Sequence, residues 1–314
     1  MSCKLLFVTA LLSATSLSAQ LLPPATPERG KLPTEVILVK GATASASDTR
    51  TPLPEDGSII DAVYRNPYLG LAYPLPAGWT EPFKGPPPSD SGAYVLVQAG
   101  SQGKGSVLVT IQDLFFSPMP VGKPLEMAKY SRDHLPSYYT VKGPPAEVTV
   151  ANHSFTRFDY SSPEAGLHWY ILATEIRCHL VKIVFTGRDP ELLESLVHDL
   201  DRMQLPYATD APACIADYAR AENLVTRVDP APYERKFNSI PVRIIIDRKG
   251  KVKHVHVISA FPDQARNITD ALLQWRFKEN ATEVETGIVF GSPRQRPTSS
   301  SPSSLAARGE SGNQ

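Results

Sequence analysis

The sequence predicts an α+β protein with two folded parts. The first is an N-terminal mixed α/β sandwich, built as an antiparallel meander with two helices, and the second is a small ββαβ domain. Three observations predict this: short strand-like runs fill residues 62–207, two segments there have helical spacing, and residues 240–290 follow the order strand, strand, helix, strand. With 314 residues, the chain is long enough for two separate cores.

The meander is predicted from runs rich in β-branched and aromatic residues that are bounded by turn formers. The expected strands are 68–75, 94–99, 107–114, 147–150, 154–160, 167–176 and 179–185. The last two should form a hairpin. Pro124 is expected to open a short helix, and Asp189 is a suitable N-cap for a second helix that begins at Pro190. That second helix should present an apolar face made of Leu192, Leu193, Leu196, Leu200 and Met203.

The C-terminal segment combines both periodicities in a short span. Apolar residues alternate along 242–246, a turn follows at Asp247–Gly250, and a valine-rich strand covers 252–258. Asn267 is expected to cap a helix whose apolar positions continue to Trp275, and 284–290 should supply a third strand. The helix is therefore expected to cover one face of a three-stranded sheet.

This C-terminal segment resembles the C-terminal domain of the TonB family of energy-transducing envelope proteins, at residues 229–291. The resemblance lies in Val242-Arg-Ile-Ile-Ile-Asp-Arg-Lys-Gly-Lys-Val252, in Ala271-Leu272 and in Trp275-Arg-Phe277. It implies a ββαβ fold that binds protein partners. Energy transduction is not expected to be inherited, because TonB proteins keep an N-terminal membrane helix and this chain is predicted to lose its apolar N-terminus.

The preceding domain is similar to the PsbP and Mog1 group of α/β/α sandwiches. The similarity rests on Tyr73-Pro-Leu-Pro-Ala-Gly-Trp79 and on the closing order of two long strands followed by a helix capped by Asp189-Pro190. Members of that group mostly bind other components and assist their assembly. The resemblance therefore implies a binding role without a shared catalytic constellation.

The N-terminus is predicted to be a cleaved export signal. Lys4 precedes the apolar run Leu5–Leu12, which is too short to span a membrane, and Leu17-Ser-Ala19 offers a signal-peptidase site before Gln20. A periplasmic or secreted protein without stable membrane insertion is expected. The predicted division is signal peptide 1–19, Pro-rich leader 20–61, α/β domain 62–207, connecting helix and linker 208–228, TonB-like domain 229–291 and disordered tail 292–314.

Composition excludes several function classes. Lys+Arg and Asp+Glu both number 32, so neither nucleic acid nor an anionic membrane surface is an expected partner. Cys178 and Cys214 remain after the predicted cleavage. They would form a disulfide in an oxidising compartment, or else stay as two buried or half-buried thiols; spacing alone leaves both alternatives open.

Candidate chemical motifs favour structural explanations. Gly100–Ser106 carries glycines and a lysine but lies between two strands, which predicts a hairpin loop instead of a phosphate loop. His254 and His256 would project from the same strand face and could share a metal, but no third ligand is near in sequence, so an exposed polar face is expected. The histidines at 153, 168, 179 and 198 are scattered singly along the chain. No enzyme, cofactor or metal is therefore predicted.

The expected activity is recognition through a strand edge. An extended peptide or an envelope protein would add to the third strand of the TonB-like sheet, at Val284, Thr286, Ile288, Val289 and Phe290. The same edge would also serve a homodimer, or be covered by the other domain. Two further alternatives are a small-molecule or hydrolytic role for the N-terminal domain with the C-terminal domain used for docking, and a membrane-tethered TonB-like transport component.

Overall fold

The computed structural model describes residues 53–55, 57–81, 91–118, 122–206, 211–232 and 239–291. These residues belong to one compact unit of the chain, 38–314. The predicted signal peptide, the leader up to residue 52 and the predicted tail lie outside the described residues. The end of the predicted leader differs from expectation, because Ser58–Ile60 forms strand β1, whose backbone pairs with β2.

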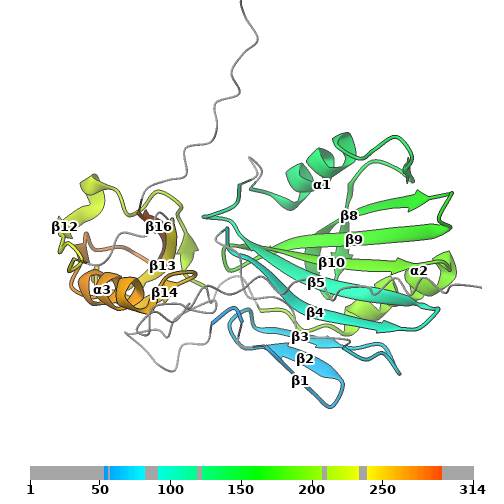
Figure 1. The fold of residues 1–314 in the computed structure, drawn as a ribbon, viewed down its shortest axis with the longest axis horizontal. Helices are drawn as coiled ribbons and strands as arrows, with labels where there is room; N and C mark the ends of the chain where they lie inside the picture. Colours follow the sequence, from blue (N-terminus) through cyan, green and yellow to red (C-terminus); the bar gives the residue numbers. More distant parts are fainter. Residues whose placement is uncertain are drawn as a thin grey trace, which may run out of the picture. The chain divides into compact units, whose positions relative to one another are not determined.

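A seven-stranded antiparallel sheet dominates the N-terminal half (Figure 1). Its strands are β4 (Ala93–Ser101), β5 (Gly105–Asp113), β6 (Thr140–Val141), β7 (Ala146–Val150), β8 (His153–Ser162), β9 (Leu167–Ile176) and β10 (His179–Gly187). Their order is β4-β5-β10-β9-β8-β6, with β7 also paired to β8. The predicted meander is confirmed, including the hairpin of β9 and β10. The predicted strand 68–75 is observed as the shorter β3 (Leu71–Pro74). It pairs with β2 (Val63–Asn66), which pairs with β1, in a separate three-stranded sheet.

Helices α1 (Pro124–Asp133) and α2 (Pro190–Asp199) cover opposite faces of the seven-stranded sheet. Successive side chains of a strand point to opposite faces. Met127 of α1 packs with Leu180 of β10, while Leu193 of α2 packs in the cluster that contains Val181. The predicted cap of α2 is confirmed, because the Asp189 side chain accepts hydrogen bonds from the backbone N–H groups of residues 191 and 192. A short 3₁₀ turn, η1 (Leu200–Arg202), continues α2.

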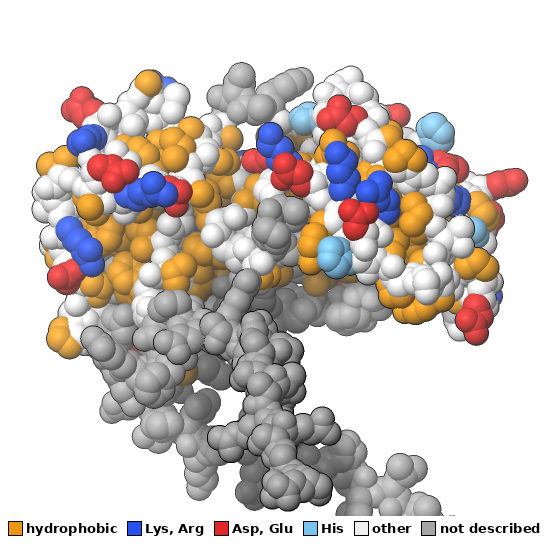
Figure 2. Space-filling view, turned by 90° about the horizontal axis from the view of Figure 1, so that it is seen from above, with side chains coloured by type: hydrophobic (Ala, Val, Ile, Leu, Met, Phe, Trp, Pro, Cys, Tyr) orange, Lys and Arg blue, Asp and Glu red, His pale blue; other side chains and the backbone are white. Residues whose placement is uncertain are grey.

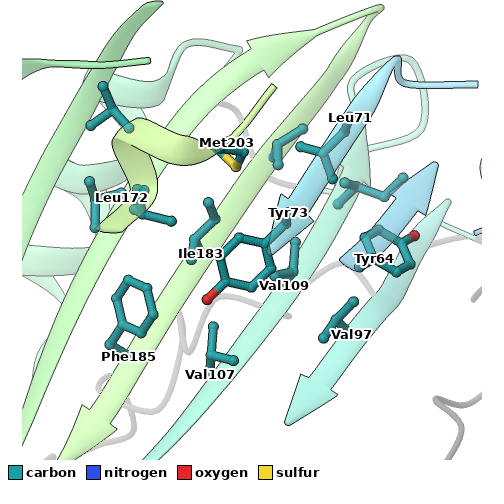
Figure 3. Packing of buried hydrophobic residues seen from close by; sticks show 14 of the residues in the cluster. Tyr64, Leu71, Tyr73, Val97, Val107, Val109, Leu172, Ile183, Phe185 and Met203 are labelled. Carbon is teal, nitrogen blue, oxygen red and sulfur yellow. The ribbon is translucent and has the colours of Figure 1, made fainter. Parts of the chain in front are cut away.

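The main hydrophobic core lies between the α2 side of this sheet and the β1–β3 sheet (Figure 3). Tyr64, Leu71 and Tyr73 of the smaller sheet, and Met203 after η1, pack against the larger one. The larger sheet contributes Val97, Val107, Val109, Leu172, Ile183 and Phe185. Burial of these apolar side chains fixes the β1–β3 sheet and α2 on the same face.

The C-terminal part is a four-stranded sheet with α3 (Pro262–Leu272) packed on it (Figure 1). Its strands are β11 (Ala213–Cys214), β13 (Ile240–Ile246), β14 (Val252–Val257) and β16 (Val284–Phe290), in the order β11-β16-β13-β14. Beside it, β12 (Leu224–Thr226), which follows the short turn η3 (Ala221–Asn223), pairs with β15 (Arg276–Phe277). The predicted order of two strands, a helix and a third strand is confirmed. The short parallel strand β11 is an addition that was not predicted.

Two local predictions are wrong. In the predicted connecting helix and linker 208–228, residues 214–225 do not form an α-helix, because their ends form β11 and β12, which pair with strands far along the chain. The N-cap of α3 is Phe261 instead of Asn267, and the helix begins at Pro262, where the side chain of Gln264 accepts a hydrogen bond from the Phe261 backbone. Asn267 instead uses its side-chain amide to bond the carbonyls of residues 231 and 232.

Charged side chains of both signs are interspersed on the face shown in Figure 2, in keeping with the equal numbers of acidic and basic residues. No helix in the described part of the chain has the length and apolar character needed to cross a membrane.

Candidate functional site

The outer side of β16 is the first candidate site. Two backbone hydrogen bonds from β11 reach the segment: Ala213 N–H donates to the carbonyl of Glu283 at 2.8 Å, and Ile215 N–H donates to that of Glu285 at 3.1 Å. The Glu285 backbone therefore points away from β13. Because backbone direction alternates along a strand, the N–H and C=O groups of Gly287 and Val289 point the same way.

Gly287 and Val289 form what we call the open edge. β11 ends before it reaches them, and within the described residues neither their N–H nor their C=O groups have a hydrogen-bond partner. Val289 is 54% exposed. Its partner on β13 is Pro241, which has no N–H and whose carbonyl instead accepts from Ile258 N–H at 3.0 Å. The Val289 backbone is thus not needed by the β13 ladder.

The opposite edge of the sheet, β14, is mostly buried. His256 pairs with Arg243, and its backbone groups point toward β13. Because backbone direction alternates along a strand, the groups of Lys253, Val255 and Val257 point away from β13. However, Val255 and Val257 have no exposed surface. Lys253 is half-buried and its ammonium bonds Glu283, so within the described small sheet the β16 side is the more accessible of the two edges.

The five residues predicted to bind a partner do not share one environment. Val284 is buried and paired with Ala213 of β11, and the hydroxyl of Thr286 donates to the carbonyl of Ala216 at 3.1 Å. Ile288 and Phe290 pack on the core under α3. Val289 alone combines exposure with outward-pointing backbone groups, and Gly287 shares that backbone direction without having been predicted.

A closed cluster of charged groups lies on the face of the small sheet opposite α3. The Arg243 guanidinium bonds the Asp113 carboxylate, donates to the Tyr68 hydroxyl at 2.9 Å and contacts His179 Nε2 at 2.6 Å. Its Nε lies 3.2 Å from Glu285 Oε1, which also accepts from the Tyr68 hydroxyl at 2.6 Å. All five residues are no more than 1% exposed. The cluster joins β5, β10 and the segment before β3 to β13 and β16.

Electrostatics explain how these groups coexist. Burial alone would lower the pKa of Arg243, but Asp113, Tyr68 and Glu285 together raise it, so the guanidinium stays charged. Burial raises the pKa of Asp113 against the opposing effect of Arg243. Burial, helped by the charge of Arg243, lowers the pKa of His179 well below its ordinary value. A neutral His179 fits the contacts: Nδ1 donates to the carbonyl of Arg177 at 2.6 Å, and Nε2 accepts from Arg243.

The expected exposed polar face at His254 and His256 is wrong. Both side chains are 1% exposed, and His256 Nε2 lies 3.6 Å from Glu55 Oε1, so the segment before β1 covers this end of the sheet face that α3 leaves free. A Cβ on Gly287 would lie 2.6 Å from the Cβ of Phe115, which shows how closely the segment after β5 approaches. No group of three residues suited to hold a metal ion occurs among the described residues.

The two cysteines form a disulfide, Cys178–Cys214, which decides the alternative that the sequence leaves open. Cys178 lies in the turn between β9 and β10, and Cys214 is on β11. The bond therefore ties the seven-stranded sheet to the short strand that occupies the first part of the β16 edge. The loop 100–106 is confirmed as a hairpin connection, with Lys104 N–H donating to the carbonyl of Ser101 at 3.1 Å.

A separate cavity of about 260 Å³ opens between the end of β3 and α2. Apolar side chains line one part of it, namely Leu75, Trp79, Leu192 and Leu196. Polar and charged side chains line the rest, namely Tyr73, Lys104, Ser195, Asp199 and Arg202. All the residues that line this cavity belong to the α/β half of the chain.

Comparisons with known proteins add a weak likeness in fold. No family model and no curated protein matches the chain, so the TonB-like assignment of residues 229–291 gains no support from them. The solution structure of cyanobacterial PsbP (CyanoP) from Synechocystis sp. PCC 6803 is similar, with 14% identity and a TM-score of 0.31 over 54% of this chain and 94% of that one. The α+β fold class stands on the strands and helices described above.

Proposed function

We propose that the chain is an exported, non-enzymatic envelope protein that binds an extended peptide, or a protein segment in extended form, by strand addition at the open edge. The single observation that carries the proposal is the unpaired, outward-pointing backbone of half-buried Gly287 and exposed Val289, next to the part of β16 that already pairs with β11. An added strand would continue where β11 stops, with main-chain hydrogen bonds supplying affinity.

The closed charge cluster supports a binding role over a catalytic one. Arg243, Asp113 and His179 have the residue types of an active site, yet each is at most 1% exposed. A substrate would have no access to their polar atoms without separating the two sheets. Their contacts instead hold the small sheet by its inner face, which keeps the outer edge of β16 in a fixed position.

The substitution Val289→Pro tests the open edge. Proline removes the N–H of residue 289, which β13 does not use because it faces Pro241, so the fold should be retained. We expect binding of peptides selected from a displayed peptide library to fall about tenfold, the effect of losing one to two net hydrogen bonds. Fluorescence anisotropy with the full chain measures it.

Val289→Thr is the matched control, because it keeps both the β-branched shape and the N–H. Equal affinity of the proline and threonine variants would rule out this edge as the recognition surface. Sedimentation of the free chain tests the homodimer alternative: a dimer that Val289→Pro dissociates would assign the edge to a second copy instead of a peptide.

Export carries its own test. Cleavage after Ala19 predicts that the protein recovered from the bacterial envelope begins at Gln20. Intact-mass measurement decides this directly. A recovered chain that still begins at Met1 would favour the membrane-tethered alternative.

A further inference from the structure

The cavity between β3 and α2 has the features of a small-ligand site. Tyr73 lines it and is only 3% exposed, yet its hydroxyl makes no hydrogen bond within the described residues. Burial and then the charge of Asp199 raise the pKa of Tyr73, so the hydroxyl keeps its proton and is available as a donor. The hydroxyl is not among the buried side-chain atoms that lack a partner, so it is accessible from the cavity, where a ligand can replace water as its partner.

The charges around the cavity favour an anion. Lys104, on the hairpin between β4 and β5, and Arg202, in η1, supply two cations against the one carboxylate of Asp199. None of the three forms an ion pair with another described side chain, so their charges are available to a guest. Two cations near a neutral hydroxyl donor match the acceptor oxygens of a carboxylate.

The apolar part of the lining favours a carboxylate that is attached to an apolar group. Leu75 and Trp79 follow β3, and Leu192 and Leu196 face them from α2. Such a lining, with a few convergent polar groups, is typical of sites for small organic ligands. At about 260 Å³, the cavity suits a molecule the size of a short aliphatic or aryl-alkyl acid.

We propose that this cavity binds a small amphipathic carboxylate, with its apolar body between β3 and α2 and its carboxylate at Tyr73, Lys104 and Arg202. The proposal is independent of strand addition at the open edge, since none of these residues belongs to the small sheet. It gives the α/β half a binding activity of its own.

The test uses 4-phenylbutanoate as the probe and the full chain with labelled leucine methyl groups. Titration should shift the methyl signals of Leu75, Leu192 and Leu196. The variant Tyr73→Phe should weaken this binding about tenfold, because one hydrogen bond to a charged group is lost. Tyr94→Phe is the matched control: Tyr94 is also buried with an unbonded hydroxyl, but it lies outside the cavity.

Two companion ligands separate the possible sources of recognition. L-Phenylalanine keeps the carboxylate and adds an ammonium that Asp199 can accept, whereas phenethylamine has the ammonium alone. Binding by both carboxylates and not by phenethylamine supports the proposal, whichever carboxylate binds more tightly. Equal binding of phenethylamine, unshifted methyl signals with both acids, or equal loss in Tyr73→Phe and Tyr94→Phe would overturn it.

Discussion

At the scale of single residues, Arg243 connects the two sheets. Removing one partner from a buried charge cluster is usually more damaging than replacing the whole cluster by apolar groups, so such clusters specify an arrangement more than they stabilise it. Here Arg243 meets Asp113 and His179 from one sheet and Glu285 from its own. Only one face and one register of the small sheet satisfies all of them.

The pH dependence of stability should report on His179. Its pKa is lowered in the folded protein, so below about pH 6.5 the unfolded chain takes up a proton that the folded chain cannot accept. Unfolding free energy should therefore fall as the pH drops from 7.5 to 5.5, with a slope approaching about 1.4 kcal/mol per pH unit for this one group. Urea unfolding at several pH values measures it.

His179→Gln keeps an acceptor for Arg243 and removes the titration, so its slope should be flatter. His198→Gln, on the exposed side of α2, is the control and should retain the wild-type slope. If His179→Gln and the wild type show parallel pH profiles, His179 is not held neutral by the fold. Asp113 does not imitate the effect: its raised pKa makes stability increase as the pH falls.

The sequence could not identify this cluster. His179 appears as one of several single histidines, and Arg243 as one polar position in an apolar strand. Their contact requires Asp113, which is 130 positions before Arg243. The only local sign is an arginine between a valine and three isoleucines, a pattern that fits an exposed strand face equally well.

At the scale of secondary-structure elements, β11 controls how much of the β16 edge is accessible. It pairs with only the first two residues of β16, and the disulfide anchors it through Cys214. A bond between residues 36 positions apart restricts the unfolded chain, which by loop entropy contributes about 4 kcal/mol to stability.

Reduction of the disulfide should therefore lower the unfolding free energy by about 2–4 kcal/mol, as measured by urea unfolding with and without a dithiol. The amides of Ala213 and Ile215 should also exchange faster with solvent, because their bonds to the β16 segment lose this anchor. The double variant Cys178→Ala with Cys214→Ala is the control and should not respond to the dithiol. Unchanged exchange at both amides after complete reduction would show that hydrogen bonds alone hold β11.

Most elements could be predicted because their signals are local. The strands of the meander and the capped helix α2 follow from periodicity and from Asp189-Pro190. The segment 214–225 has apolar residues near helical spacing, but pairing with β15 and β16 determines its structure. Such pairing is set by tertiary contacts that a window of sequence does not contain.

At the scale of the whole molecule, the sequence predicts the strand 284–290 correctly but not what surrounds it, and binding at its edge stays a prediction. The strand 284–290 was expected to be the outermost one, with the face opposite the helix exposed. In the structure, β11 lies outside part of that strand and the groups around Asp113 cover the face. Both differences come from contacts with the α/β half, and they reduce a seven-residue edge to the positions of Gly287 and Val289.

The placement of β16 has a consequence for biosynthesis. It is the final strand of the described chain, yet it lies between β11 and β13, and it carries the glutamate that faces Arg243. The small sheet cannot close until translation has passed Phe290. A chain truncated before Val284 would lack Glu285, which leaves the buried Arg243 guanidinium with too few acceptors. Such truncated products should be recognised and degraded as incompletely folded.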